Sequence, residues 1–390
     1  MRHTVWSRWG PAFALVALLA VGSAFAAHRW PSEPQWTTSD SLFYQADLLR
    51  VQGVEKKEAL SRVFNGRLAS ALREAESDLP VDRRKVSNPA WVAYSARFYE
   101  RRWVVPVLAA AAEPKLGDKA LAAVSLAGYA LCGPLFFLLL RRRFGTAPSV
   151  IGALACLFLF PLRYWSGFPL TDSFGVALES AALLCGALVI EKGPRWLPLW
   201  MLALCMLGFT RDAGVIVLVG AVWLAIRGRT RTGGLLAVTG LLALLPAPFV
   251  FRAPLREHLA YVVNGYRIPS SASWSFVLDH YPHAIKEFLR RDVSYLVHHA
   301  LTALIVVGGL ALLAILARGR NSVDRFLRAA AVGAFAYLLL LPDYTGFRLE
   351  LVVVPFVGLG IAAGAAKLGT VTERIVRARG EPSSADLPSS

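Results

Sequence analysis

Long apolar stretches separated by short polar breaks constrain this chain more than any other feature. Of its 390 residues 56% are apolar, and the mean hydropathy is +0.49. Runs close to about 20 residues match the hydrocarbon thickness of a bilayer, where only helices or closed barrels satisfy every backbone polar group. The runs are continuous rather than alternating, which favours helices over barrel strands. We therefore predict an all-α polytopic membrane protein.

About ten spans can be delimited, with an uncertainty of two because two of them are short. Arginine-rich short loops then fall on one side, which the positive-inside rule assigns to the cytoplasm. We predict a single transmembrane domain over residues 1–366 in the plasma (inner) membrane, both termini cytoplasmic, and a disordered tail at 367–390. The spans are 11–27, 119–140, 148–162, 173–190, 196–209, 213–226, 233–251, 299–317, 326–341 and 349–366.

The N-terminal run has an alternative reading, because Ala24-Phe25-Ala26 resembles a signal-peptide cleavage site. The many later spans favour an uncleaved first span. The net charge of +16 does not indicate nucleic-acid binding, since the arginines lie in short loops and not on one polar face. The four cysteines lie inside apolar runs without metal-ligand spacing.

Two exported loops are expected, at residues 28–118 and 252–298. In the first, apolar residues recur every three to four positions over 55–76, which predicts an amphipathic juxtamembrane helix. The stretch 90–112 carries Trp91, Tyr94, Phe98, Tyr99 and Trp103 and predicts an interfacial helix bent near Pro106. The aromatic residues of the second loop indicate either an interface belt or a sugar-stacking platform.

Acids, arginines and aromatics converge on the exported side in this topology. A mixed cluster of this kind over apolar walls suits a reaction between a lipid-borne anion and a polar acceptor. The cytoplasmic loops offer mostly arginine and no comparable mixture. The candidate residues are Asp40, Tyr44, Arg101, Arg102, Arg163, Asp172, Arg211, Asp212, Asp343, Tyr344 and Arg348.

Glu179 follows Asp172 by seven residues, so it lies on the same helix face about 10 Å deeper. It forms either a structural hydrogen bond or part of a functional cavity. The other candidates also have structural alternatives: Asp40 as a helix cap, Arg163 with Asp172 as a loop salt bridge, and Arg211 or Arg348 as interface anchors. The histidines at 280, 283, 298 and 299 form no convincing zinc set.

Several nucleotide and hydrolase motifs are absent. The chain has no Gly-rich phosphate loop and no dinucleotide fingerprint, so no site for a nucleotide sugar or ATP is indicated. It also lacks the Gly-x-Ser-x-Gly elbow and the HExxH motif.

The residues after the first span resemble the polytopic GT-C glycosyltransferases, of the mannosyltransferase and aminoarabinose-transferase kind. Asp40-x-x-x-Tyr44, followed by Gly53, is similar to the acidic motif of that family's first exported loop. The segment 98–106, Phe-Tyr-Glu-Arg-Arg-Trp-Val-Val-Pro, is similar to its aromatic-Arg-x-x-x-Pro segment. Looser matches are Thr171-Asp172, Thr210-Arg211-Asp212, and Arg348 with Pro355.

The resemblance implies a role for each matched residue. Asp40 would be the general base for a sugar transferred, with inversion, from a polyprenyl-phosphate donor to a cell-envelope acceptor; its place at a helix start should keep it ionised. Arg102, Arg101, Arg348 and Arg211 would bind the donor phosphate. The helix over 55–76 would line the lipid access. The substrate cavity would include Tyr44, Arg163, Asp172, Asp212 and Glu179.

One departure from the family pattern bears on metal binding. Many members place a second acid beside the first, whereas here the neighbours are Ser39 and Ser41. A Mg²⁺ or Mn²⁺ ion is therefore an open alternative that the motif does not support, and no cofactor is predicted. A transporter or lipid flippase, a membrane scaffold and a glycan polymerase or ligase are the competing functions. The sequence does not define the sugar, the acceptor or the oligomeric state.

Overall fold

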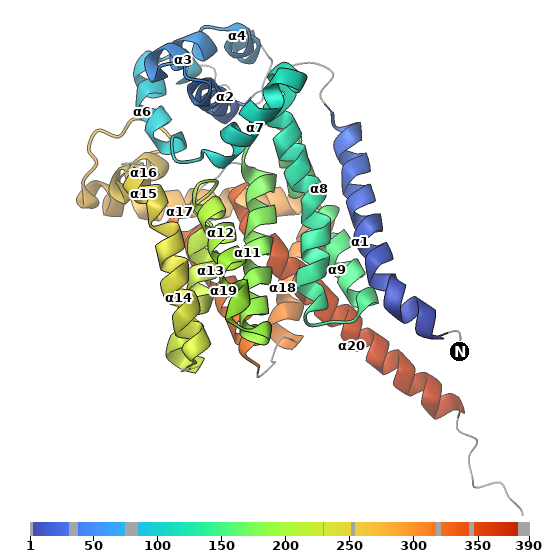
Figure 1. Cartoon of the computed structure of the whole chain (residues 1–390). Coiled ribbons are helices and arrows are strands. Elements are labelled where there is room, and N and C mark those ends of the chain that lie inside the picture. Colours follow the sequence, from blue (N-terminus) through green and yellow to red (C-terminus); the bar gives the residue numbers. More distant parts are fainter. Residues whose placement is uncertain are drawn as a thin grey trace, which may run out of the picture.

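The computed structural model describes residues 3–30, 38–74, 85–228, 230–250, 254–316, 321–342 and 347–380. Within these ranges every regular element is a helix. A bundle of long apolar helices carries a cap of shorter ones at one end (Figure 1). The cap consists of α2 (Ser39–Val51), α3 (Lys56–Phe64), α4 (Arg67–Glu74) and α6 (Pro89–Tyr99).

The first half of the bundle surrounds the buried helix α11. Helix α8 packs against α1 and α9 as well as α11, and α12 packs against the other side of α11. Helix α7 joins the cap to α8 (Figure 1). The bounds are α1 (His3–His28), α7 (Val104–Leu116), η1 (Gly117–Lys119), α8 (Ala120–Arg141), α9 (Thr146–Leu157), α10 (Phe160–Ser166), α11 (Asp172–Lys192), η2 (Pro194–Trp196) and α12 (Leu197–Gly208).

The second half completes the bundle. Helix α13 packs between α14 and α19, and α18 packs along α20, which also contacts α9. The bounds are α13 (Gly214–Gly228), α14 (Arg231–Leu244), α15 (Pro246–Val250), α16 (Leu255–Val263), α17 (Trp274–His298), α18 (Ala300–Leu316), α19 (Ser322–Leu340), η3 (Leu349–Val353) and α20 (Val354–Gly380).

The described helices identify a multi-pass membrane protein. Five are long and apolar enough to cross a bilayer, and up to seven spans result if each bent pair counts as one. The bent pairs are α9 with α10, at 56°, and α17 with α18, at 113°. A helix stands at each of the ten expected runs, although α12 and α13 have only 12 and 15 residues. The count of ten itself stays a prediction.

Three local expectations need correction. The helix predicted over 55–76 is two helices, α3 and α4, which are separated at Asn65 and Gly66. The stretch 90–112 breaks at residues 100–103 and not at Pro106, because Pro106 lies in the first turn of α7, where its missing N–H is no loss. The tail predicted to be disordered from residue 367 is helical through Gly380, and residues 381–390 lie outside the described ranges.

Helices α8 and α11 approach so closely that a glycine is required between them. A Cβ added at Gly128 would lie 2.6 Å from the backbone N and Cα of Phe174. A hydrogen bond joins the two helices near this crossing, from Ser173 Oγ to the Ser125 carbonyl (2.6 Å), and a second, from Ser125 Oγ to the Ser166 carbonyl (3.2 Å), joins α8 to the end of α10. The crossing therefore fixes the start of α11, where Asp172 lies.

Gly128→Ala should lower the thermal unfolding midpoint in detergent, because a backbone–backbone clash forces α8 and α11 apart, at a cost of about 1–3 kcal/mol. The matched control is Gly234→Ala in α14, where an added Cβ meets nothing within 4 Å. There the better helix propensity of alanine should leave the midpoint unchanged or slightly higher. Equal midpoints for the two variants would contradict the tight crossing.

Candidate active site

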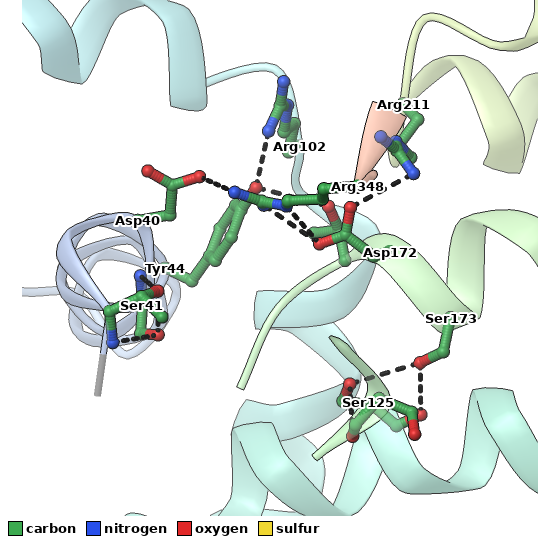
Figure 2. A network of polar contacts seen from close by, with 12 residues as sticks. Asp40, Ser41, Tyr44, Arg102, Ser125, Asp172, Ser173, Arg211 and Arg348 are labelled. Atoms are coloured by element: carbon green, nitrogen blue, oxygen red, sulfur yellow. Dashed lines mark hydrogen bonds and ion pairs between the residues drawn. The ribbon is translucent and has the colours of Figure 1, made fainter. Parts of the chain in front are cut away.

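Asp40 lies in the first turn of α2, in a position that the local sequence sets. Thr38 caps the helix: its side chain accepts a hydrogen bond from the Ser41 N–H (3.3 Å), and Ser41 Oγ accepts one from the Thr38 N–H (3.1 Å). The alternative that Asp40 is the cap is therefore wrong. The Asp40 side chain, 18% exposed, is left to point toward the bundle (Figure 2). Tyr44 lies one helical turn further on.

Arg348 joins Asp40 to Asp172. Its Nη1 lies 2.5 Å from Asp40 Oδ2, while its Nε and Nη2 lie 3.0 and 2.9 Å from Asp172 Oδ2. Arg211 continues the series, with Nη1 at 3.1 Å from Asp172 Oδ1 in an ion pair without hydrogen-bond geometry. Figure 2 shows the two carboxylates on either side of the Arg348 guanidinium. Four segments of the chain thus meet in one line of alternating charges.

Tyr99 and Trp165 complete the surroundings of this line. The Tyr99 hydroxyl donates to Asp40 Oδ1 over 2.6 Å, and its ring stacks on Phe43 at 4.4 Å. Burial and the neighbouring Asp40 raise the pKa of Tyr99 well above its ordinary value, so the hydroxyl stays a donor. The Trp165 ring lies 5.4 Å from the Arg348 guanidinium. Both carboxylate oxygens of Asp40 therefore have a partner.

Arg102 differs from the other arginines of the site. Its Nη1 donates to the Tyr44 hydroxyl (2.7 Å), which also contacts Thr171 Oγ1 (3.2 Å), and its guanidinium lies over the Tyr99 ring. Among the residues that the structure describes, it forms no ion pair, and its buried Nε has no hydrogen-bond partner. Tyr44, Tyr99 and Asp212 nevertheless outweigh burial and raise the pKa of Arg102, so it remains charged. Arg102 is thus a half-buried cation without a paired anion.

Asp40, Arg102 and Arg348 line a cavity of about 60 Å³, which is room for roughly two water molecules. Tyr44 and Asp172, predicted for the substrate cavity, are not in its lining. One wall comes from α2 and α6 and the other from α16, α19 and the turn before η3. Among the described lining residues, three arginines face two aspartates, a net charge of +1. The polar lining consists of Asp40, Tyr99, Arg102, Arg211, Asp212, His258, Tyr261, Tyr266, Tyr337 and Arg348.

Asp212 and His258 line this cavity, and their surroundings determine the protonation state of each. Burial alone would raise the pKa of Asp212, but Arg101, His258 and Arg102 hold it below its ordinary value. Burial and the neighbouring Arg101 lower the pKa of His258 to about 3 against the opposing charge of Asp212. Asp212 is therefore ionised and His258 neutral near pH 7.

Some predicted site residues lie elsewhere. Arg101 pairs with Asp212 and does not line the cavity. Arg163 lies over the Phe25 ring of α1 at 5.2 Å and is not in the cavity lining. The ion pairs of Asp172 are with Arg211 and Arg348, so the alternative of an Arg163–Asp172 salt bridge is not formed. Glu179 is buried below the cavity, and its Oε1 has no hydrogen-bond partner among the described residues. Asp343 and Tyr344 lie outside the described residues.

Sequence reasoning missed His258 and Tyr337 as lining residues. His258 was one histidine in a long loop, and Tyr337 was one aromatic residue inside an apolar run, so neither had a motif to mark it. Within the described ranges no group of three or more His, Cys, Asp or Glu residues is placed to hold a metal ion. Each of the three aspartates near the cavity is already paired with arginine.

Comparison with known proteins decides the fold. No family model and no curated protein matches the sequence. Among solved structures, the chain is similar to ArnT from Cupriavidus metallidurans bound to undecaprenyl phosphate, with 13% sequence identity and a TM-score of 0.53. The match covers 94% of this chain and 63% of ArnT. The chain has a GT-C-like fold.

In this GT-C-like fold, α2 also contributes to a second charged cluster, whose residues do not line the cavity. Asp47 Oδ1 lies 2.8 Å from Arg50 Nη1, and Lys56 of α3 pairs with Glu100, directly before Arg101 and Arg102. Burial raises the pKa of Asp47 to about 6; Arg50 opposes this and Glu100 adds to it. The Lys56–Glu100 pair therefore ties α3, the helix that follows α2, to the loop of Arg102, and the cluster contains a carboxyl with a pKa of about 6.

Between about pH 4 and 7 the contribution of His258 to thermal stability should rise, because burial lowers its pKa to about 3, and the contribution of Asp47 should fall. The pKa of Asp47 in the folded protein, about 6, exceeds the ordinary value of 3.8, so this contribution is fully present below about pH 3.8 and is lost through pH 6. Its size is on the order of 2–3 kcal/mol. Asp47→Asn should remove the falling contribution, so its unfolding midpoint should gain on that of the wild type as the pH rises from 4 to 7, whereas Glu58→Gln, at an exposed position, should not change the profile. An unchanged slope in Asp47→Asn would assign the dependence to other groups.

Proposed function

We propose that this protein is an inverting membrane glycosyltransferase. It moves a sugar from a polyprenyl-phosphate donor to an acceptor hydroxyl of the cell envelope, with Asp40 as general base. One observation carries the proposal: Arg102, a cation without a paired anion, faces the same cavity as the Asp40 carboxylate. A base beside an anion site is what transfer from a phosphate donor needs. The GT-C-like fold supports the reaction class.

The net charge of the cavity lining complements the phosphate charge of the donor before transfer and of the released lipid phosphate after it. A polyprenyl-phosphate sugar is a phosphodiester with one negative charge, and the described lining has a net charge of +1. The acceptor oxygen attacks the anomeric carbon and its proton passes to Asp40. The bond from that carbon to the phosphate oxygen breaks, and its electron pair leaves with the phosphate. The lining then carries +2 and faces a dianionic lipid phosphate, so transition-state charge is stabilised as it develops.

Arg348 has a double role in this scheme. Paired with Asp40, it occupies Oδ2, one of the two carboxylate oxygens that could take the acceptor proton. A donor phosphate bound at Arg102 offers Arg348 a second anion nearby. Movement of Arg348 toward that phosphate frees Asp40 Oδ2 for the acceptor proton. Arg211, already held beside Asp172, supports the same phosphate.

The place of the site supports a lipid-borne donor. Nucleotide sugars are cytoplasmic, and the arginine-rich loops put the cap on the opposite side of the membrane, with both termini in the cytoplasm of an inner-membrane protein. A donor for that side has to be membrane-anchored. The similar protein ArnT was solved with undecaprenyl phosphate bound, and we propose a lipid of that class as the carrier here. The cavity of about 60 Å³ must widen to admit the sugar.

The deciding experiment incubates the purified protein in lipid nanodiscs with a panel of radiolabelled polyprenyl-phosphate sugars and cell-envelope glycolipids. Transfer of label to an acceptor, with release of polyprenyl phosphate, supports the proposal. Labelled lipid that crosses the bilayer of sealed vesicles without transfer would indicate a flippase and overturn it.

Asp40→Asn should reduce transfer about 10²–10⁴-fold, because the amide cannot take the acceptor proton. The protein should still accumulate, since an amide can keep the Tyr99 contact. Asp47→Asn, on the same helix but outside the cavity, is the matched control and should retain activity. Transfer at the wild-type rate in Asp40→Asn would remove Asp40 as the base.

Arg102→Met should raise the KM for the donor roughly 10- to 100-fold, the loss expected for one charge-assisted contact to phosphate. The KM for the acceptor should change little. Arg97→Met is the control, because Arg97 lies five residues earlier, pairs with Glu257 (3.0 Å) and does not line the cavity. A larger effect on the acceptor than on the donor would contradict the phosphate role.

A further inference from the structure

Helix α17 has three distinct faces. Val277, Ala284 and Phe288 form a face buried against the protein. A second face is polar and consists of His283, Glu287, Arg290 and Ser294, three or four residues apart. The third face is apolar yet exposed. Successive residues of this face are four or eleven positions apart in the sequence, and both spacings place side chains on the same side of a helix. It contains Trp274, Leu278, Leu289, Val293 and Val297, each between 49% and 71% exposed.

A helix that contacts only the rest of the protein and water would have a buried apolar face and a polar face, without an exposed apolar one. The protein covers the first and water solvates the second, so the third requires an apolar partner. The exposed stripe continues into α18 at Leu301 and Leu304, both 70% exposed. Because α18 is an apolar helix of the bundle, this continuity identifies the partner of its stripe as the hydrocarbon of the bilayer. The same surface then extends along α17.

The direction of α17 agrees with this partner. It is bent by 113° from α18, so it runs close to the membrane plane if α18 crosses the bilayer. Figure 1 shows it lying across the bundle, between the long helices and the cap. Lys286, Arg290 and Arg291 are basic residues of this helix, suited to phosphate headgroups.

We propose that α17 is a lipid-surface helix, seated in the leaflet on the cap side of the membrane, whose position sets that of Arg348. Its apolar stripe enters the acyl-chain boundary and its basic residues contact anionic headgroups.

A column of stacked rings links α17 to Arg348. Tyr295 of α17 stacks on Phe347 (5.3 Å, 13°) and on His299 at the α17–α18 bend (4.2 Å, 18°). Phe347 has φ +58°, a left-handed conformation that a bulky residue adopts only when its surroundings enforce it. Since Arg348 is the next residue, the stack that holds Phe347 also sets the start of the Arg348 side chain. Tyr295 is thus a positioning residue, and this step rests on the proposed function.

Cysteine labelling in nanodiscs tests the lipid seat without reference to activity. Cysteines are placed on the stripe (Leu278→Cys, Val293→Cys) and on the polar face (His283→Cys, Ser294→Cys) in a chain whose four native cysteines are replaced by alanine. All four positions are exposed in the structure, so a difference in rate reports the lipid. Nanodiscs of mixed anionic and zwitterionic phospholipid leave both membrane faces open to a charged maleimide. Stripe positions should react roughly tenfold more slowly than polar ones. Equal labelling rates at the stripe and polar positions would overturn the proposal. So would slow labelling at all four positions, which is the result expected if a second copy of the protein covered the helix.

Substitution of Tyr295 tests the link to Arg348. Tyr295→Leu should raise the donor KM roughly tenfold with little change in the acceptor KM, and Tyr295→Phe, which keeps the ring, should restore it. A uniform loss of kcat without the KM change would assign Tyr295 a general structural role and overturn the link. If wild-type protein transfers no sugar, the proposed function fails, while the labelling result still decides whether α17 lies on lipid.

Discussion

The contact of one guanidinium with two carboxylates determines the geometry of the whole cavity. Arg348 reaches Asp40 from the first helix of the cap and Asp172 from the start of the buried helix α11. In surroundings this poorly solvated, a charge left without its partner costs several kcal/mol. The contact of Arg348 with both carboxylates therefore stabilises the positions of all three segments relative to one another. The cap is fixed to the bundle by the same atoms that face the cavity.

Helix starts bring the acids of this site together. Asp40 and Asp172 both lie in the first turn of their helices, where the exposed N–H groups and the helix dipole favour a negative charge. The starts of α2 and α11 face one another, and the Tyr44–Thr171 hydrogen bond joins them. Like charges would repel at this distance, so the arrangement depends on Arg348 between them. A carboxylate cluster becomes stable at the rim of an apolar bundle in this way.

Local patterns in the sequence predicted more of this structure than its long-range contacts. The apolar runs predicted the helical bundle because span length depends only on neighbouring residues. Asp40 and Tyr44 share one face of α2 through simple helical spacing. The pairing of Asp40 with Arg348 joins residues 308 positions apart, and no local pattern encodes it. The prediction that Arg163 lies in the substrate cavity was wrong for the same reason. The local pattern located Arg163 near a helix end, but tertiary packing directs its side chain toward α1 and Phe25.

The compact state of the cavity follows from how its charges are paired. With Arg348 on two aspartates and Arg101 on Asp212, only Arg102 remains for an incoming anion. Under the proposed function, an anion bound there competes with Asp40 for Arg348, whose position depends on the turn at Phe347 and Arg348, directly before η3. That turn is held by the strained Phe347 and its stack on α17. Under the proposed function, the contact of Arg348 with Asp40 is therefore coupled to the position of α17.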